Sequence, residues 1–224
     1  MEIRVMANIL EKNDQIADEL KAILGAHGIF VLNLLGSPGS GKTTLLEHTL
    51  AALKEEMDIA VIEGDLFTSK DADRIARQEV LVVQINTGGG CHLDASMVKS
   101  ALTNLDLAAL DLIIIENVGN LVCPAEFDIG EDCKVTVLSI TEGEDKPLKY
   151  PLVFKQAKAV LLNKVDLLPY TSFSMEAACE DLASINPGVK LLPVSCRSGE
   201  GLVHWYSWLR QQVKQKKTRS QADD

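Results

Sequence analysis

The segment Gly36-Ser37-Pro38-Gly39-Ser40-Gly41-Lys42-Thr43 matches the pattern G-x-x-x-x-G-K-[ST]. An apolar run at 29–35 precedes it, and a segment of helical character at 41–56 follows it. In this context the glycines allow consecutive backbone N–H groups to point at phosphate oxygens, and the helix adds the positive end of its dipole. The sequence therefore predicts a phosphate-binding P-loop rather than a glycine-rich turn without a ligand.

The loop residues predict particular contacts with a nucleoside triphosphate. We expect Lys42 to reach the β- and γ-phosphates and the Thr43 hydroxyl to ligate Mg²⁺. The positions expected to contact the nucleotide here are Gly36, Ser37, Gly39, Ser40, Gly41, Lys42, Thr43 and Thr44.

Apolar segments alternate with helical segments along the rest of the chain. Predicted strands lie near 58–63, 80–85, 111–115, 134–140, 158–162 and 189–194, and predicted helices lie near 92–103, 148–156, 172–184 and 199–214. Near-continuous apolar strands between helices are typical of a mostly parallel sheet flanked by helices on both faces. We therefore expect an α/β fold of the P-loop NTPase type, with ligands at the carboxyl ends of the strands.

Length and composition are those of an ordinary globular protein. The chain has 224 residues, 46% of them hydrophobic, and a formal net charge of −10. This acidity argues against nucleic-acid binding, and the lack of an apolar run of about 18 residues argues against a membrane span. The N-terminal segment does not have the pattern of a secretory signal, so we expect a cytoplasmic protein whose cysteines are not disulfide-bonded.

Three segments divide the chain. We predict a helical extension at 1–28, a nucleotide-binding domain at 29–212 and a disordered tail at 213–224. The extension carries one apolar stripe at helical spacing, formed by Ile16, Leu20, Ile23 and Leu24. Such a stripe predicts a helix packed on the domain, and a docking element for a partner protein is the alternative.

Two carboxylates at predicted strand ends are candidates for catalysis together with Lys42. Asp65 follows one apolar strand, and Glu116 follows another, three residues before Gly119. In nucleotide switches a glycine at this place can donate its N–H to the γ-phosphate. Glu116 is expected to hold a Mg²⁺ water, and Asp65 to orient the metal shell or the attacking water. The alternative for either carboxylate is a helix N-cap or a solvated turn.

The tetrapeptide Asn163-Lys164-Val165-Asp166 follows another apolar run and predicts recognition of guanine. The Asp166 carboxylate can accept hydrogen bonds from guanine N1–H and the N2 amine, which adenine does not offer. The Lys164 stem can cover the base, while Asn163 braces the loops. Ser195 and Cys196, after the last predicted strand, are expected to place a backbone N–H near guanine O6.

Cys91, His92 and Cys123 form a candidate metal site. Cys91 and His92 end a glycine-rich loop after a predicted strand, and Cys123 lies just past Gly119. Thiolate and imidazole together suit Zn²⁺, Ni²⁺ or Cu⁺, although packing as small hydrophobic residues remains open for the cysteines. Because these residues fall short of a tetrahedral set, water or a second chain would complete it. Cys179, in a helical segment, is expected to pack in the core.

The P-loop, Glu116-Asn117-Val118-Gly119, Asn163-Lys164-Val165-Asp166 and the Cys91–His92–Cys123 cluster together resemble the HypB family. These motifs lie within residues 29–212. The resemblance implies a GTPase that assists nickel insertion during [NiFe]-hydrogenase maturation and forms a homodimer when GTP is bound. It also implies a nickel or zinc site at the dimer interface, HypA as a partner, and the hydrogenase large subunit as the acceptor.

The chain departs from some family members in its cysteines and histidines. No cysteine precedes Cys91, and the four histidines are not adjacent, so we expect neither the cysteine-rich second metal site nor a nickel-storage stretch. A GTPase serving another nickel enzyme, such as urease, and a non-catalytic metal carrier remain alternatives. The short path from Glu116 to Cys123 also suggests that a rearrangement at Gly119 links nucleotide state to metal geometry.

Overall fold

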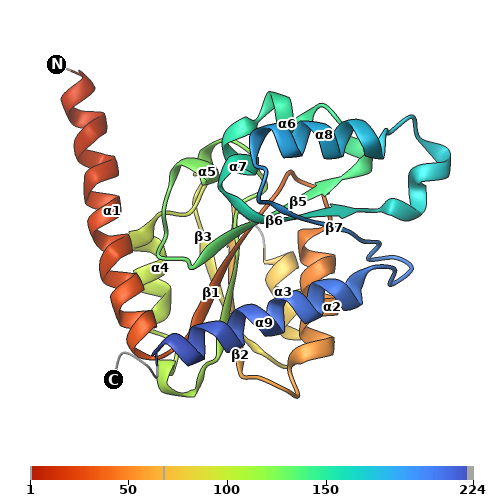
Figure 1. The fold of residues 1–224 in the computed structure, drawn as a ribbon. Coiled ribbons are helices and arrows are strands. Elements are labelled where there is room, and N and C mark those ends of the chain that lie inside the picture. Colours follow the sequence, from red (N-terminus) through yellow and green to blue (C-terminus); the bar gives the residue numbers. More distant parts are fainter. Residues whose placement is uncertain (1, 68, 221–224) are drawn as a thin grey trace.

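The computed structural model describes residues 2–67 and 69–220 and has a seven-stranded parallel sheet at its centre (Figure 1). The strand order is β3-β2-β4-β1-β5-β6-β7, and every neighbouring pair is parallel. The strands are β1 (Phe30–Leu35), β2 (Ile59–Asp65), β3 (Leu81–Asn86), β4 (Leu112–Glu116), β5 (Cys133–Ser139), β6 (Ala157–Asn163) and β7 (Lys190–Pro193). The α/β P-loop NTPase fold expected from the sequence is confirmed.

Helices cover both faces of the sheet because alternate strand residues point to opposite sides. On one face the core is shared with α2 (Lys42–Leu53), α3 (Lys70–Ala76) and α9 (Leu202–Ser220). On the other face, α1 (Glu2–Ala26) and α4 (Ala95–Leu102) cover one half of the sheet. The other half packs against α5 (Cys123–Glu126), α7 (Pro151–Gln156) and α8 (Met175–Ile185), and the short α6 (Lys146–Lys149) precedes α7.

Several element boundaries differ from the expectations for local reasons. The helix expected at 148–156 is two helices, α6 and α7, which meet at Tyr150 and Pro151. The helix expected from residue 92 begins after Asp94, whose side chain accepts a hydrogen bond from the Met97 N–H and caps it. The short helices α3 and α5 were not expected. None of the helices in the described ranges is long and apolar enough to cross a membrane.

The segment expected to be a disordered tail is helical as far as the structure describes it. Residues 213–220 continue α9, where Val213 is buried and Lys216 pairs with Asp132 at 2.6 Å. Ser220 donates to the Gly25 carbonyl oxygen at 3.1 Å, which joins the end of α9 to α1. The expectation is therefore wrong for 213–220, and the remaining 221–224 lie outside the described residues.

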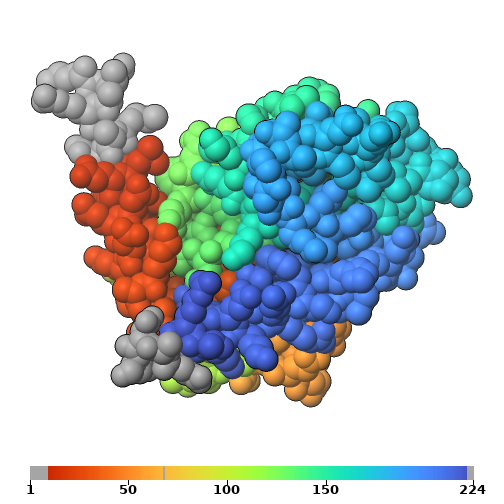
Figure 2. Space-filling model, viewed as in Figure 1, coloured from red at the N-terminus to blue at the C-terminus, as the bar shows by residue number. Residues whose placement is uncertain are grey.

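Helix α1 lies along one side of the molecule (Figure 2). Leu20 and Leu24 of the expected stripe are buried, together with Ala17, whereas Ile23 is largely exposed. A Cβ on Gly130, which has φ +88°, would come within 2.6 Å of the Leu20 side chain, so only glycine allows this close approach. The helix therefore packs on the sheet domain through a narrow part of its surface.

Candidate functional site

The P-loop follows β1 and leads into α2 with the backbone that its glycines permit. Gly36 has φ +153°, and a Cβ there would lie 2.5 Å from the Val137 carbonyl oxygen. Gly41 has φ +102°, and a Cβ there would lie 2.3 Å from the Asn163 side-chain nitrogen. Lys42 is buried at the start of α2, and its Nζ donates to the Gly36 carbonyl oxygen at 3.1 Å. Burial lowers the pKa of this lysine.

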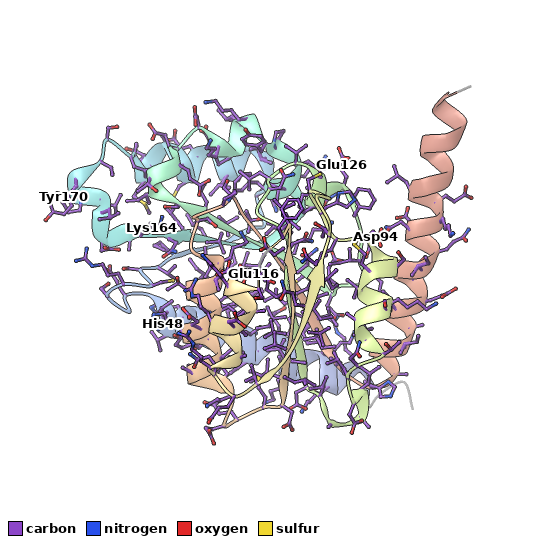
Figure 3. The ribbon with its side chains drawn as sticks, turned by 180° about the vertical axis from the view of Figure 1, so that it is seen from behind. His48, Asp94, Glu116, Glu126, Lys164 and Tyr170 are labelled. Atoms are coloured by element: carbon purple, nitrogen blue, oxygen red, sulfur yellow. The ribbon has the colours of Figure 1, made fainter. Side chains whose placement is uncertain are left out.

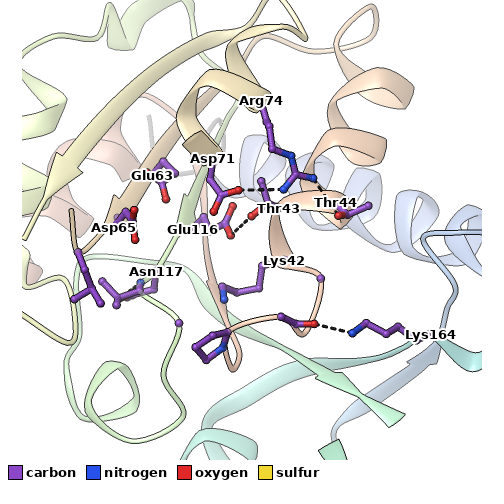
Figure 4. A pocket seen from close by; sticks show the side chains of 17 residues that line it. Lys42, Thr43, Thr44, Glu63, Asp65, Asp71, Arg74, Glu116, Asn117 and Lys164 are labelled. Carbon is purple, nitrogen blue, oxygen red and sulfur yellow. Dashed lines mark hydrogen bonds and ion pairs between the residues drawn. The ribbon is translucent and has the colours of Figure 1, made fainter. Parts of the chain in front are cut away.

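A cavity of about 460 Å³ opens beside this loop at the carboxyl ends of β2 and β4 (Figure 4). Its volume is within the range usual for small-molecule sites. The walls combine expected site residues with residues that the motifs did not indicate. They include Pro38, Gly39, Gly41, Lys42, Thr43, Thr44, Glu63, Asp65, Asp71, Arg74, Glu116, Asn117, Gly119 and Lys164.

Two buried glutamates stand side by side in this cavity. Glu63 and Glu116 are paired in register on β2 and β4, and Glu116 Oε1 accepts a hydrogen bond from the Thr43 hydroxyl at 2.8 Å. Burial is the main cause that raises the pKa of Glu116 to about 7. Burial, with the neighbouring Glu116 charge, raises the pKa of Glu63 to about 8.

The acidic group fits a divalent cation. Among the described residues, the Oε2 atoms of Glu63 and Glu116 are buried without a hydrogen-bond partner. A hard cation such as Mg²⁺ takes oxygen ligands, and here it would meet the Thr43 hydroxyl, Asp65 and these carboxylates. Sequence reasoning identified Thr43, Asp65 and Glu116 but missed Glu63, because an acidic residue inside an apolar strand carries no motif.

Helix α3 contributes two further charged residues that sequence reasoning missed. The Arg74 guanidinium donates to Thr44 Oγ1 at 3.1 Å, to Glu47 at 2.6 Å and to Asp71 at 3.0 Å. Both Asp71 and Arg74 line the cavity. Their spacing of three residues on one helical face was the available signal, but the seven-residue helix that carries them was itself not expected.

Of the residues expected to read the base, Asn163, Lys164, Asp166 and Cys196 line an adjoining cavity of about 240 Å³, whereas Ser195 is fully buried and does not line it. The Asn163 amide donates to the Ser40 carbonyl oxygen at 2.9 Å and accepts from the Cys196 N–H at 3.2 Å. Ser195 Oγ donates to Asp166 at 2.5 Å, and Lys164 Nζ donates to the Gly39 carbonyl oxygen at 2.7 Å. The Asn163–Asp166 loop is thus tied directly to the P-loop.

Cys91, His92 and Cys123 come together as one group, with their ligand atoms all within 4.8 Å of one another. Cys91 is exposed, which rules out core packing for it. A hydrogen bond with Cys123 raises the pKa of the Cys91 thiol, and burial lowers the pKa of His92. The His92 ring stacks on Phe127 with a centroid distance of 3.9 Å. Thiol and imidazole donors at this separation fit a borderline cation such as Ni²⁺ or Zn²⁺.

The other cysteines do not join this cluster. Cys133 and Cys196 are buried. Cys179 is exposed, so the expectation of core packing is wrong. The reason is the orientation of α8, which turns Ala178 and Leu182 to the core and Cys179 away from it.

The Cys91–His92–Cys123 cluster and the cavity beside the P-loop meet at the segment that follows β4. Asn120 forms an isolated bridge with Gly36 of the P-loop, and a Cβ on Gly119 would lie 2.9 Å from the Pro38 ring. Figure 3 shows Glu116 near the middle of the molecule, with Asp94 and Glu126 to one side and Lys164 to the other. The segments that carry the Cys91–His92–Cys123 cluster and the Asn163–Asp166 loop therefore flank the cavity on opposite sides.

Comparison with known proteins gives consistent matches. Residues 30–193 match the family model "CobW/HypB/UreG, nucleotide-binding domain". The hydrogenase maturation factor HypB of Azotobacter vinelandii is 53% identical over 210 residues, covering 94% of this chain and 69% of that protein. The HypB of Escherichia coli (strain K12) is 50% identical over 210 residues, covering 94% and 72%. The crystal structure of Helicobacter pylori HypB in complex with nickel has a TM-score of 0.87 and 40% identity, covering 92% of this chain and 97% of that one.

Proposed function

The chain belongs to the HypB family of hydrogenase maturation factors, within the CobW/HypB/UreG nucleotide-binding proteins, and from this premise we propose that it is a GTP-hydrolysing switch for nickel delivery. One observation carries the proposal: Glu116, the last residue of β4, lines the nucleotide cavity, and the segment that follows leads to Cys123 in the candidate metal cluster. A change at the phosphates would therefore be felt at the metal ligands.

Guanine recognition is supported by the arrangement around Asp166. The Asp166 carboxylate lines the adjoining cavity and accepts a hydrogen bond from Ser195 Oγ. A guanidinium nitrogen of Arg197 lies 3.9 Å from its Oδ2 atom. A carboxylate at this place pairs with two donors of guanine and with none of the corresponding atoms of adenine. This difference favours GTP over ATP.

Hydrolysis would use the residues that surround the phosphate end of the cavity. Lys42 supplies positive charge beside the β- and γ-phosphates. Gly119, which packs on Pro38 of the P-loop, would donate its backbone N–H to the γ-phosphate. Thr43 and Glu116 would hold Mg²⁺, which neutralises phosphate charge when bound. Asp65, at the end of β2, would orient the attacking water.

Nickel or zinc would be carried by Cys91, His92 and Cys123. These residues provide three ligand atoms per chain, so a second copy of the chain would complete the coordination and make the GTP-bound form a homodimer. We propose HypA as the partner that docks on α1 and the hydrogenase large subunit as the acceptor. Another nickel enzyme such as urease would place the same demands on this site.

The test is steady-state phosphate release by the purified protein with GTP and with ATP. We expect multiple turnovers with GTP and at most about a hundredth of that rate with ATP, because a mismatched buried carboxylate is costly. Asp166→Asn should lose hydrolysis of GTP at limiting nucleotide concentration and should gain hydrolysis of xanthosine triphosphate. Asp181→Asn serves as the control. Binding of GTP without turnover would favour a non-catalytic metal carrier instead.

A further inference from the structure

Two asparagines are buried in the sheet beside the nucleotide cavity. Asn117 follows β4, lines the cavity and is 1% exposed, and Asn33 lies within β1 and is fully buried. Polar side chains in such a core are retained only when their hydrogen bonds are made, so their partners indicate what they do.

The partners of Asn117 connect the cavity to the segment that carries His92. Its Oδ1 accepts from the Val118 N–H at 3.0 Å and from the Leu93 N–H at 3.1 Å. Val118 precedes Gly119, where the γ-phosphate would be sensed, whereas Leu93 directly follows His92. One carbonyl oxygen thus joins the nucleotide segment to the metal segment.

The partners of Asn33 extend the connection to the segment after Cys123. Asn117 Nδ2 donates to Asn33 Oδ1 at 3.2 Å, and Asn33 Nδ2 donates to Glu131 Oε1 at 3.4 Å. Glu131 Oε2 in turn accepts from the Ile129 N–H at 2.7 Å. This buried chain ends two residues beyond Phe127, the ring on which His92 stacks.

Helix α1 fixes the far ends of both segments. Asn13 Oδ1 accepts from the Ala95 N–H at 2.9 Å, and Asn13 Nδ2 donates to the Asp128 carbonyl oxygen at 2.8 Å. With these points held, a displacement of Asn117 would be confined to the stretches 91–94 and 118–127. Those stretches contain all the proposed metal ligands.

We infer that Asn117 is a positioning residue that transmits the nucleotide state to His92 through Leu93, in a relay with Asn33. The inference rests on the proposed function. It adds a side-chain connection from Asn117 to Leu93 beside the main-chain path from Glu116 to Cys123. If Val118 and Gly119 shift toward a γ-phosphate, Asn117 shifts with them. Leu93 follows, because leaving its buried N–H without an acceptor is unfavourable.

The experiment measures Ni²⁺ affinity by competition with a chromophoric chelator, at saturating GDP and at saturating non-hydrolysable GTP analogue. The wild-type protein should show a ratio of the two dissociation constants between about 5 and 150. Asn117→Leu, which keeps the volume and removes both hydrogen-bonding atoms, should lower that ratio to about 2 or less. Asn117→Asp keeps the acceptor for Leu93 and should retain most of it.

A matched control is Thr136→Val on β5, which removes another fully buried polar group that is not part of the relay. It should leave the ratio unchanged. Hydrogen exchange at the Leu93 amide gives an independent readout: its protection should differ between the two nucleotide states in wild type and no longer differ in Asn117→Leu. If Asn117→Leu does not fold, Asn33→Ser withdraws the Oδ1 acceptor that holds Asn117 Nδ2 in place and should lower the ratio at least twofold.

The outcomes separate the two ideas. A wild-type ratio of one would overturn the proposed switch and the relay with it. A normal wild-type ratio that persists in both Asn117→Leu and Asn33→Ser would overturn the relay alone and leave the main-chain path to Cys123 as the coupling.

Discussion

The nucleotide cavity and the metal cluster lie at the same edge of the sheet but are built differently. The cavity takes its side chains from strand ends and helix starts, and Lys42, Thr43, Glu63 and Glu116 are all buried there. The cluster takes Cys91 and His92 from a loop and Cys123 from the start of the short helix α5, and Cys91 is exposed. The cavity is therefore preformed for its ligand, whereas the cluster provides only part of the set of ligands that a metal ion needs.

This difference indicates which region can move. Displacing Glu116 would disturb the register between β2 and β4, whereas Cys91 and His92 lie in a loop outside the sheet, so displacing them breaks no strand pairing. A rigid site suits selection among nucleotides, and a loop-borne site suits release of a cargo. The proposed switch uses the first to control the second, and variants should therefore affect the two regions unequally.

The largest expected effect is on nucleotide binding, in a variant that should leave metal binding unchanged. Lys42→Ala should weaken binding of a fluorescent GTP analogue by about 100-fold or more, because the charge at the β- and γ-phosphates is lost. Ni²⁺ affinity without nucleotide should stay within about twofold of wild type. Lys54→Ala, on the surface end of α2, is the control. An equal loss of both affinities would mean that the two regions form one site.

The reciprocal variant should weaken metal binding and leave nucleotide binding unchanged. Cys123→Ala should weaken Ni²⁺ binding by about 10- to 100-fold, since one ligand is removed. GTP binding should change by less than about twofold, and sedimentation with the GTP analogue should show less metal-dependent dimer. Cys179→Ala controls for loss of an exposed thiol. Stoichiometric metal bound as tightly as in wild type would exclude the cluster as the site.

A smaller effect distinguishes binding from chemistry within the cavity. Asp65→Ala should lower the single-turnover rate of GTP hydrolysis by about 10- to 100-fold and change GTP affinity by less than about threefold. Quenched-flow and equilibrium titration give the two numbers. Asp73→Ala, an exposed residue on α3, should change neither. Equal hydrolysis by the Asp65 variant would remove this residue from the mechanism.

The smallest effect is the pH dependence of stability that Glu63 and Glu116 contribute in the cavity. Glu63 and Glu116 have ordinary pKa values of 4.5 but hold their protons up to about 8 and about 7 in the folded chain. Between these values the unfolded chain binds fewer protons, so stability falls as pH rises. The Tm without nucleotide should drop by roughly 4–10 °C from pH 5 to 8, measured by calorimetry. Glu63→Gln should flatten this slope, and an unchanged slope would contradict the assignment.

The parts that the sequence predicted are those whose residues are neighbours along the chain. The P-loop, the Asn163–Asp166 loop and the apolar strands are local patterns with a direct physical reading. Arg74 and Asp71 were missed because α3 has too few residues for an apolar period to show. Asn117 and Asn33 were missed because their contact depends on β1 and β4 being neighbours, which no local pattern encodes. The apolar periodicity predicted one continuous helix at 148–156, but the chain is interrupted at Tyr150 and Pro151, where α6 ends and α7 begins.

The packing of α1 on segments that follow it in the chain has a consequence for folding during synthesis. Helix α1 is made before the segments that it contacts, which include Ala95, Asp128, Gly130 and the end of α9. During most of translation the apolar side chains of Ala17, Leu20 and Leu24 therefore have no surface to cover them. A nascent chain of this protein presents an uncovered amphipathic helix until the segments through Ile129 have emerged, which makes α1 a natural target for a chaperone during synthesis.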